Sequence, residues 1–453
     1  MPRHRIAVLL LTNEGFYRVD GGVGRYLHNI LDAGQVSDDV ATKQGVTLDW
    51  HVAERTLGGR IDPAVLDRAL DRYVRTGQVT FHPLVDPRRD AAETDHFEHF
   101  VALGAAVGQL VVQLAGTADS VLVIGGMSMF GMAPRYVLRA ADQLGLPVSF
   151  VHLTHNPVIT AHGGSDRPEA YSDAVTGHLA RADERVCVGW ESEWMRRQYA
   201  SVHGIPDDKL LFARAGVPVD DPKFARQDPI RVQRILAELG VPLDRPLVVS
   251  WGRGGAGKGF TLLVEACHRI DDRLVPVVLN PLANQPLADL VTRIGSRAVL
   301  LSGQDDEVLT ALCQWPGTVS ASFLSWVEAA SVTPIEAALM NGGRGMVVSA
   351  VPTGVYRELV VPGRNGVLAG ERSVAAVAEM LNGLAELSEV ERLVLSRHAD
   401  EDARRNHDFV TNWRISLHGM LERHLRTIGR SAEQRREAQR KRFMYADGKV
   451  RFG

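Results

Sequence analysis

Two charged motifs in the second half of the chain have residue types suited to binding a phosphorylated ligand. The first is segment 252–259, Gly-Arg-Gly-Gly-Ala-Gly-Lys-Gly, in which Arg253 and Lys258 flank a glycine-rich turn. A guanidinium holds two phosphate oxygens in one plane and an ammonium acts as a point charge, so the two cations can clamp a diphosphate. A Walker A phosphate loop needs a hydroxyl residue after its lysine to ligate magnesium, and Gly259 has none. The motif therefore favours a diphosphate clamp over an NTPase site.

The second motif is a pair of glutamates, Glu328 and Glu336, eight positions apart. Thr333 and Pro334 between them predict a helix start, with the threonine as N-cap and the proline at the first helical position. Glu336 then falls in the first turn and Glu328 on the preceding loop, so both acids can face one ligand at the helix N-terminus. Spacing alone leaves open that the two carboxylates are unrelated.

Gly21 and Gly22 form a third candidate, because they precede a helical segment. Glycines at that position let backbone N–H groups approach an anion, which the helix dipole favours. The pair is not a dinucleotide-binding fingerprint, since a polar loop of about eight residues separates it from its strand. A plain turn is the alternative interpretation.

His155 is the fourth candidate, at the carboxyl end of an apolar strand that Pro157 terminates. His152, three positions earlier, suggests a metal site, but the pair has no acidic or cysteine partner nearby in the sequence. Hydrogen bonding to a polar substrate is the favoured role. We expect no metal and no resident cofactor.

Apolar strand-like runs alternate with helical patterns over most of the chain, which indicates parallel sheets built from βαβ units. The first set of predicted strands spans 5–12, 46–54, 79–85, 120–126, 147–155, 185–190 and 210–217, and the second set spans 247–251, 275–280, 298–302, 318–324 and 345–350. Predicted helices span 23–33, 64–76, 91–115, 133–144, 192–203 and 230–239, and the chain from 374 onward is helical. The fold class is therefore α/β, with two doubly wound Rossmann-like domains and a ligand cleft at the carboxyl ends of their strands.

Composition is that of an ordinary soluble protein: 453 residues, 45% hydrophobic, 23% charged and a net charge of -3. This charge gives no indication of a nucleic-acid partner. The three cysteines are far apart and favour a reducing, cytoplasmic location. The longest apolar stretch, 101–116, is shorter than the roughly 20 residues of a membrane span and predicts a buried helix. Residues 421–453 hold ten Arg or Lys against four Asp or Glu, which suits either a solvated helix or contact with an anionic membrane surface.

Taken in order, these motifs resemble those of the retaining GT-B glycosyltransferases, the group that includes glycogen synthases and sucrose-phosphate synthases. The match consists of the Gly-Gly loop, the His-Asn strand end, the Arg-Lys loop, the glutamate pair and a glycine-rich turn at 353–359, followed by 362–366. It extends over about residues 5 to 385. The Arg-Lys loop and the glutamate pair are its most specific parts. The chain departs from the family at 329–331, where Ala-Ala-Ser replaces the usual Gly-Phe-Gly.

The resemblance implies transfer of a sugar from a nucleotide diphosphate sugar to an acceptor hydroxyl, with retention of configuration and without a required metal. It implies that Arg253 and Lys258 hold the diphosphate, Glu336 the ribose and Glu328 the hydroxyls of the transferred sugar. His155 would hydrogen-bond the donor sugar near the reacting carbon. Gly21 and Gly22 would allow close approach to the phosphate or the acceptor.

The domain boundaries expected from this resemblance are 1–222 for an acceptor-binding domain and 223–407 for a nucleotide-sugar-binding domain. Residues 408–453 would form helices that cross back to the first domain, followed by a basic tail. Two other functions stay open: a GT-B sugar-nucleotide epimerase or phosphorylase, and a non-catalytic nucleotide-sugar-binding protein. The donor base, the sugar, the acceptor, which is a small molecule or a glycan, and the oligomeric state have no readable signal.

Overall fold

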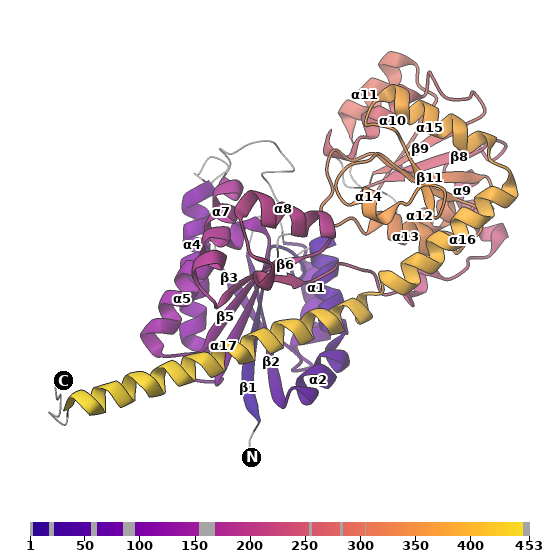
Figure 1. Ribbon diagram of the computed structural model, residues 1–453. Helices are drawn as coiled ribbons and strands as arrows, with labels where there is room; N and C mark the ends of the chain where they lie inside the picture. The colour runs from indigo at the N-terminus through magenta and orange to yellow at the C-terminus, as the bar shows by residue number, and fades with distance from the viewer. Residues whose placement is uncertain are drawn as a thin grey trace. The chain divides into compact units, whose positions relative to one another are not determined.

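The computed structural model describes residues 3–17, 22–55, 61–84, 96–153, 168–252, 256–280, 284–303 and 305–446, which form two compact units (Figure 1). Unit 1 comprises residues 1–190, 196–213 and 413–453, and unit 2 comprises 191–195 and 214–412. Each unit is built around its own parallel sheet.

The sheet of unit 1 has the strand order β3-β2-β1-β4-β5-β6-β7, and its pairs are all parallel. Its central strands are mainly hydrophobic and are buried over nearly their whole length, as a sheet covered by helices on each side requires. The strands are β1 (His4–Thr12), β2 (Val46–Arg55), β3 (Thr80–Leu84), β4 (Ser120–Gly126), β5 (Val148–Leu153), β6 (Val186–Trp190) and β7 (Leu210–Phe212).

Helices cover both faces of this sheet (Figure 1). On one face α4 packs against α5 and α7, and on the other face α1 and α2 lie beside β1 and β2. The helices are α1 (Gly22–Asp32), α2 (Gly34–Lys43), α3 (Pro63–Ala69), α4 (His96–Leu114), α5 (Ala133–Leu144), α7 (Pro168–Ala182), α8 (Glu193–His203) and α17 (Phe409–Ala446), with the short helices η1 (Leu70–Val74), η2 (Ser128–Phe130) and η3 (Asp207–Lys209). Within the part of the chain that is described, none of the helices combines the length and the apolar character that crossing a membrane requires.

The sheet of unit 2 has the order β10-β9-β8-β11-β12-β13, again with parallel pairs. Its strands are β8 (Leu247–Trp251), β9 (Val275–Asn280), β10 (Val299–Ser302), β11 (Thr318–Phe323), β12 (Val347–Ala350) and β13 (Gly366–Leu368). Its helices are α9 (Pro229–Glu238), α10 (Phe260–Ala266), α11 (Gln285–Ile294), α12 (Asp306–Gln314), α13 (Thr333–Asn341), α14 (Tyr356–Leu359), α15 (Val374–Glu386) and α16 (Glu389–Asn406), with η4 (Pro222–Phe224) and η5 (Ala256–Lys258). Strands and helices enclose one continuous hydrophobic core.

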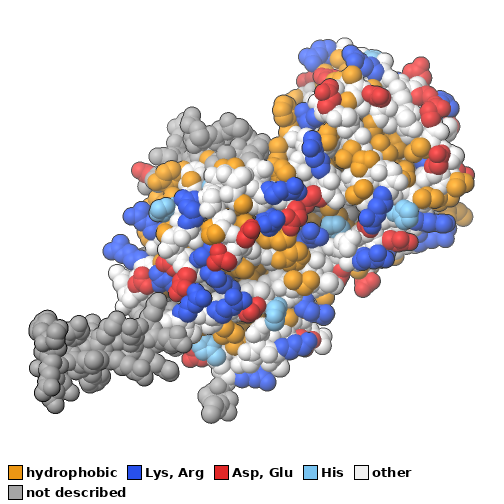
Figure 2. Space-filling view, viewed as in Figure 1, with side chains coloured by type: hydrophobic (Ala, Val, Ile, Leu, Met, Phe, Trp, Pro, Cys, Tyr) orange, Lys and Arg blue, Asp and Glu red, His pale blue; other side chains and the backbone are white. Residues whose placement is uncertain are grey.

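The predicted fold class is confirmed, since both sheets are parallel and doubly wound. Several elements were not predicted. Strand β13, three residues long, is too short to produce a period, and α2 continues almost directly from α1. Helices α7, α11, α12 and α14 were missed as well. The predicted strand 210–217 ends at Phe212. Basic and acidic side chains are interspersed over the visible face of each unit, as the small net charge suggests (Figure 2).

Helix α17 crosses the amino-terminal edge of the sheet in unit 1. His424 is buried there, with one ring nitrogen 2.9 Å from the hydroxyl of Ser120 and the other 2.9 Å from that of Ser149. These serines stand at the start of β4 and near the start of β5. Burial, and to a smaller extent the nearby His4, lowers the pKa of His424 to about 3.

We expect His424 to make unit 1 sensitive to acid. The imidazole takes up a proton near pH 6.5 in the unfolded chain, whereas the buried imidazole stays neutral down to about pH 3. The contribution of His424 to the free energy of unfolding is therefore complete above pH 6.5 and is lost as the pH falls below it. Between pH 7 and pH 5 this one group should lower the free energy of unfolding by about 2 kcal/mol. Urea unfolding at both pH values, compared between wild type and His424→Asn, isolates the effect. An equal pH dependence in both proteins would contradict it.

Candidate functional site

Three candidate residues of unit 2 that the structure describes, Lys258, Glu328 and Glu336, fall in segments that follow the carboxyl ends of the neighbouring strands β8 and β11. Strands β8 and β11 are neighbours in the sheet although they are not consecutive in the sequence. The order in which strands are added to the sheet therefore reverses between them. In doubly wound sheets the loops diverge at such a switch point, and ligands bind outside it. Lys258 lies on the loop after β8 and Glu328 on the loop after β11, on the two sides of this point.

Lys258 and Glu328 form an ion pair, in which the lysine ammonium contacts Oε1 of the glutamate. The lysine side chain is 33% exposed and the glutamate 16%, so the pair is partly open to solvent. The structure therefore brings together two predicted site residues that are 70 positions apart.

Backbone contacts hold the loop of Glu328 on both sides. The N–H of Trp326 donates to the carbonyl oxygen of Gly257, at 2.9 Å, and the N–H of Val355 donates to the carbonyl oxygen of Glu328, at 2.8 Å. Further along, the hydroxyl of Ser192 donates to the carbonyl oxygen of Ala329 at 2.6 Å. The Ala-Ala-Ser segment that departs from the family pattern is thus a packed part of the loop.

Glycine is required at two of these contacts. A Cβ atom on Gly354 would overlap the carbonyl oxygen of Glu328, and one on Gly259 would overlap that of Leu324. Both glycines also have positive φ angles, of +52° and +71°. Gly259 therefore serves the close approach of two loops, which a residue with a side chain would prevent.

Glu336 lies in the first turn of α13, as predicted, and its side chain is 6% exposed. Its Oε1 atom is 2.7 Å from the ammonium of Lys223, which sequence reasoning missed. The expectation that Thr333 is the N-cap is wrong, because the helix begins at Thr333 itself. The Thr333 hydroxyl instead lies 2.9 Å from that of Ser331.

Two aromatic residues flank the loop of Glu328. Trp326 is 60% exposed, and the guanidinium of Arg372 lies 4.1 Å from its ring centroid. Tyr356 is buried and donates its hydroxyl to Ser325, at 3.2 Å. Burial raises the pKa of Tyr356, and the charge of Glu328 raises it further, so this phenol stays protonated as a hydrogen-bond donor.

Three predicted residues, Arg253, Gly21 and His155, lie outside the described residues.

Gly22 is the first residue of α1 and is exposed. The N–H of Gly24 donates to Glu14, at 3.0 Å, and Glu54 accepts from the N–H groups of residues 16 and 17. Buried carboxylates therefore bind the backbone on both sides of the Gly-Gly loop, which the sequence did not indicate.

A second cluster of buried polar side chains lies at the carboxyl ends of β4 and β5. Nε2 of His152 is 3.5 Å from Asp173, and the hydroxyl of Ser128 donates to Asp173 at 3.1 Å. Met127, directly before Ser128, has a φ angle of 91°, which is strained for a residue with a side chain. Asp173 thus holds the turn that follows β4.

Comparisons with known proteins were made by sequence and by structure. No protein-family model and no curated protein sequence matches the chain. Among solved structures, a glycosyltransferase from Rickettsia africae ESF-5 matches with a TM-score of 0.65 and 15% identity, over 94% of this chain and 99% of that one. Sucrose-phosphate synthase from Thermosynechococcus elongatus matches with a TM-score of 0.67 and 18% identity, over 93% and 99%. HepE from Anabaena, in complex with UDP-glucose, matches with a TM-score of 0.61 and 17% identity, over 90% and 98%.

The chain has the GT-B glycosyltransferase fold. The resemblance predicted from the order of motifs is confirmed at this level. The identities are low, so the roles of the individual site residues stay predictions.

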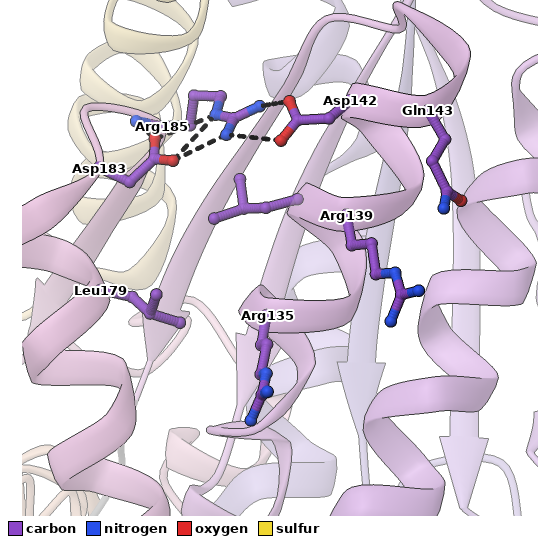
Figure 3. A pocket seen from close by; sticks show the side chains of 8 residues that line it. Arg135, Arg139, Asp142, Gln143, Leu179, Asp183 and Arg185 are labelled. Carbon is purple, nitrogen blue, oxygen red and sulfur yellow. Dashed lines mark hydrogen bonds and ion pairs between the residues drawn. The ribbon is translucent and has the colours of Figure 1, made fainter.

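A hollow of about 540 Å³ in unit 1 is lined by eight residues, none of which is a predicted site residue (Figure 3). Arg185 crosses it to bind both Asp142 and Asp183 (Figure 3). Arg185 directly precedes β6, so this end of the hollow, which extends along α5 and α7, is at the amino-terminal edge of the sheet. Ligands of doubly wound sheets bind at the opposite edge.

We expect Gly354→Ala to destabilise the loop that carries Glu328. Its positive φ costs a residue with a side chain about 1–2 kcal/mol, and overlap with the Glu328 carbonyl should add about 1–3 kcal/mol. The matched control is Gly363→Ala, which has a φ of +75° but whose Cβ would meet no described atom within 4 Å. Equal losses of unfolding free energy in the two variants would show that the close approach is unimportant.

Proposed function

We propose that this protein is a retaining glycosyltransferase that moves a sugar from a nucleoside diphosphate sugar to an acceptor hydroxyl. The observation that carries the proposal is the Lys258–Glu328 ion pair, located at the switch point of a GT-B fold. A cation and a carboxylate held side by side can bind the two halves of a sugar diphosphate. The ammonium suits the phosphate oxygens, and the carboxylate suits the sugar hydroxyls.

In this proposal the charge of Lys258 stabilises the leaving group. As the bond from the anomeric carbon to the phosphate oxygen breaks, its electron pair stays on the oxygen, where a fixed ammonium lowers the energy of the developing charge. The acceptor oxygen bonds to the anomeric carbon on the same face, and its proton passes to the departing phosphate. Arg253 is the second cation of this clamp.

Donor binding would exchange the partners within the ion pair. In the structure, Glu328 neutralises Lys258. A bound diphosphate would take over the ammonium, and the Glu328 carboxylate could then accept hydrogen bonds from the transferred sugar. Glu336 would bind the ribose, His155 the donor sugar, and Gly21 and Gly22 the phosphate or acceptor. These roles rest on the family resemblance.

Uridine diphosphate sugars are the first donors to test, because HepE was solved with UDP-glucose and with UDP and glucose. This choice transfers a neighbour's ligand to the present chain. The acceptor has no comparable guide, so the first assay should depend on the donor alone.

We expect UDP and UDP-glucose to raise the melting temperature of the wild type, since ligand at a hundred times its Kd stabilises the native state by about 2.7 kcal/mol. Lys258→Ala should weaken binding about 10-fold to 100-fold, because a charged hydrogen bond contributes roughly 1.5–3 kcal/mol. Lys43→Ala, on the exposed surface of α2, is the matched control and should bind like the wild type.

Turnover distinguishes the transferase from the other functions. We expect the wild type to release glucose slowly from UDP-glucose with the α configuration retained. Proton NMR spectra recorded before mutarotation would show this configuration. Glu328→Gln should lose the release. Formation of an epimeric sugar nucleotide would indicate an epimerase, and a need for inorganic phosphate would indicate a phosphorylase. Binding without any product, with every acceptor tried, would support a non-catalytic binding protein.

A further inference from the structure

Glu336 is a buried carboxylate whose compensating charge comes from a distant part of the chain. Its side chain is 6% exposed, and an ionised carboxylate in such a place is costly unless it is paired. The ammonium of Lys223 lies 2.7 Å from Oε1 and is itself only 17% exposed. Lys223 precedes Glu336 by 113 positions and belongs to η4, before the first strand of unit 2.

The position of Lys223 is fixed by contacts of its own. Its N–H donates to the carboxylate of Asp221 at 2.9 Å, and its carbonyl oxygen accepts from the hydroxyl of Thr310 at 3.2 Å. The ammonium also lies 5.0 Å from the ring centroid of Phe224. A lysine held at its backbone and at its ammonium loses little further freedom when it orients a partner.

The charge of Lys223 has a consequence for what Glu336 can bind. An ionised carboxylate is purely an acceptor, whereas a protonated one carries a donor and accepts less strongly. Each of the two hydroxyls of a ribose can donate its proton to a carboxylate oxygen. The contact with Lys223 therefore restricts the Glu336 carboxylate to one orientation in which it can accept from a ribose.

We propose that Lys223 is a positioning residue of the nucleotide site, which holds the Glu336 carboxylate in one orientation so that the site selects ribonucleotides over deoxyribonucleotides. This inference rests on the proposed function and extends it to a residue outside the recognised motifs. Lys223 acts through Glu336. A purely structural ion pair would contribute to stability but would not distinguish a ribose from a deoxyribose.

The test is calorimetric titration of UDP and 2′-deoxy-UDP into the wild type, Lys223→Met and Lys223→Arg. We expect the wild type to bind UDP at least about tenfold more tightly than 2′-deoxy-UDP, the usual size of one hydrogen bond to a charged group. Lys223→Met should lose most of this preference, chiefly through weaker binding of UDP. Lys223→Arg should keep it, because a guanidinium retains the positive charge and can hold a carboxylate.

Two further variants guard against misfolding and nonspecific effects. The double variant Lys223→Met/Glu336→Gln leaves no unpaired buried charge, so it should fold, and it should also lack the preference. Arg226→Met changes an exposed cation three residues along and should bind both nucleotides like the wild type.

The outcomes separate this inference from the proposed function. If the wild type prefers UDP and Lys223→Met keeps the full preference, Lys223 is structural and the inference is wrong while the transferase proposal stands. If Lys223→Met weakens the binding of UDP and of 2′-deoxy-UDP by the same factor, the inference is also wrong. If the wild type binds none of UDP, ADP and GDP, the nucleotide site itself is wrong and both proposals fail.

Discussion

Loops that leave neighbouring strands of a parallel sheet at their carboxyl ends have to pass one another, and in unit 2 three such loops touch backbone to backbone. The loop of Glu328 donates to the Gly257 carbonyl on one side and accepts from Val355 on the other. Gly259 and Gly354 make these approaches sterically allowed. Rigid backbone contacts of this kind fix a side chain more precisely than a mobile loop could, and a binding site requires such precision.

Charges are placed on this framework in pairs. Lys258 with Glu328 and Lys223 with Glu336 each join one cation to one carboxylate, and they differ in burial. The more exposed pair can exchange partners with a ligand at little cost, because water solvates the released group. The more buried pair cannot do so without leaving an uncompensated charge, which suits it to holding a fixed geometry.

The buried polar side chains of unit 1 lie in two groups, one at the amino-terminal edge of its sheet and one at the carboxyl edge. At the amino-terminal edge, His424 of α17 joins the strands through serine hydroxyls. At the carboxyl edge, Glu54 and Asp173 bind the turns that follow β1 and β4, and Glu14 accepts from the N–H of Gly24 in α1. The first edge stabilises the attachment of the last helix, and the second orders the turns around the region where a ligand of a doubly wound sheet would lie.

The sequence by itself determined the α/β class and nearly all of the strands, because buried parallel strands are continuous apolar runs that alternate with helical periods. It also predicted Lys258, Glu328 and Glu336 as site residues, since their motifs lie within short segments whose residue types and order are recognisable. It did not reveal β13, which is too short for a period, nor the true start of α13, where Val332 and not Thr333 holds the cap position. Only the tertiary structure brought Lys258 to Glu328 and Lys223 to Glu336, and it placed carboxylates on both sides of the Gly-Gly loop. The physical reason is that periodicity and spacing encode local geometry, whereas ion pairs and close backbone approaches join residues up to 113 positions apart and depend on how the elements pack.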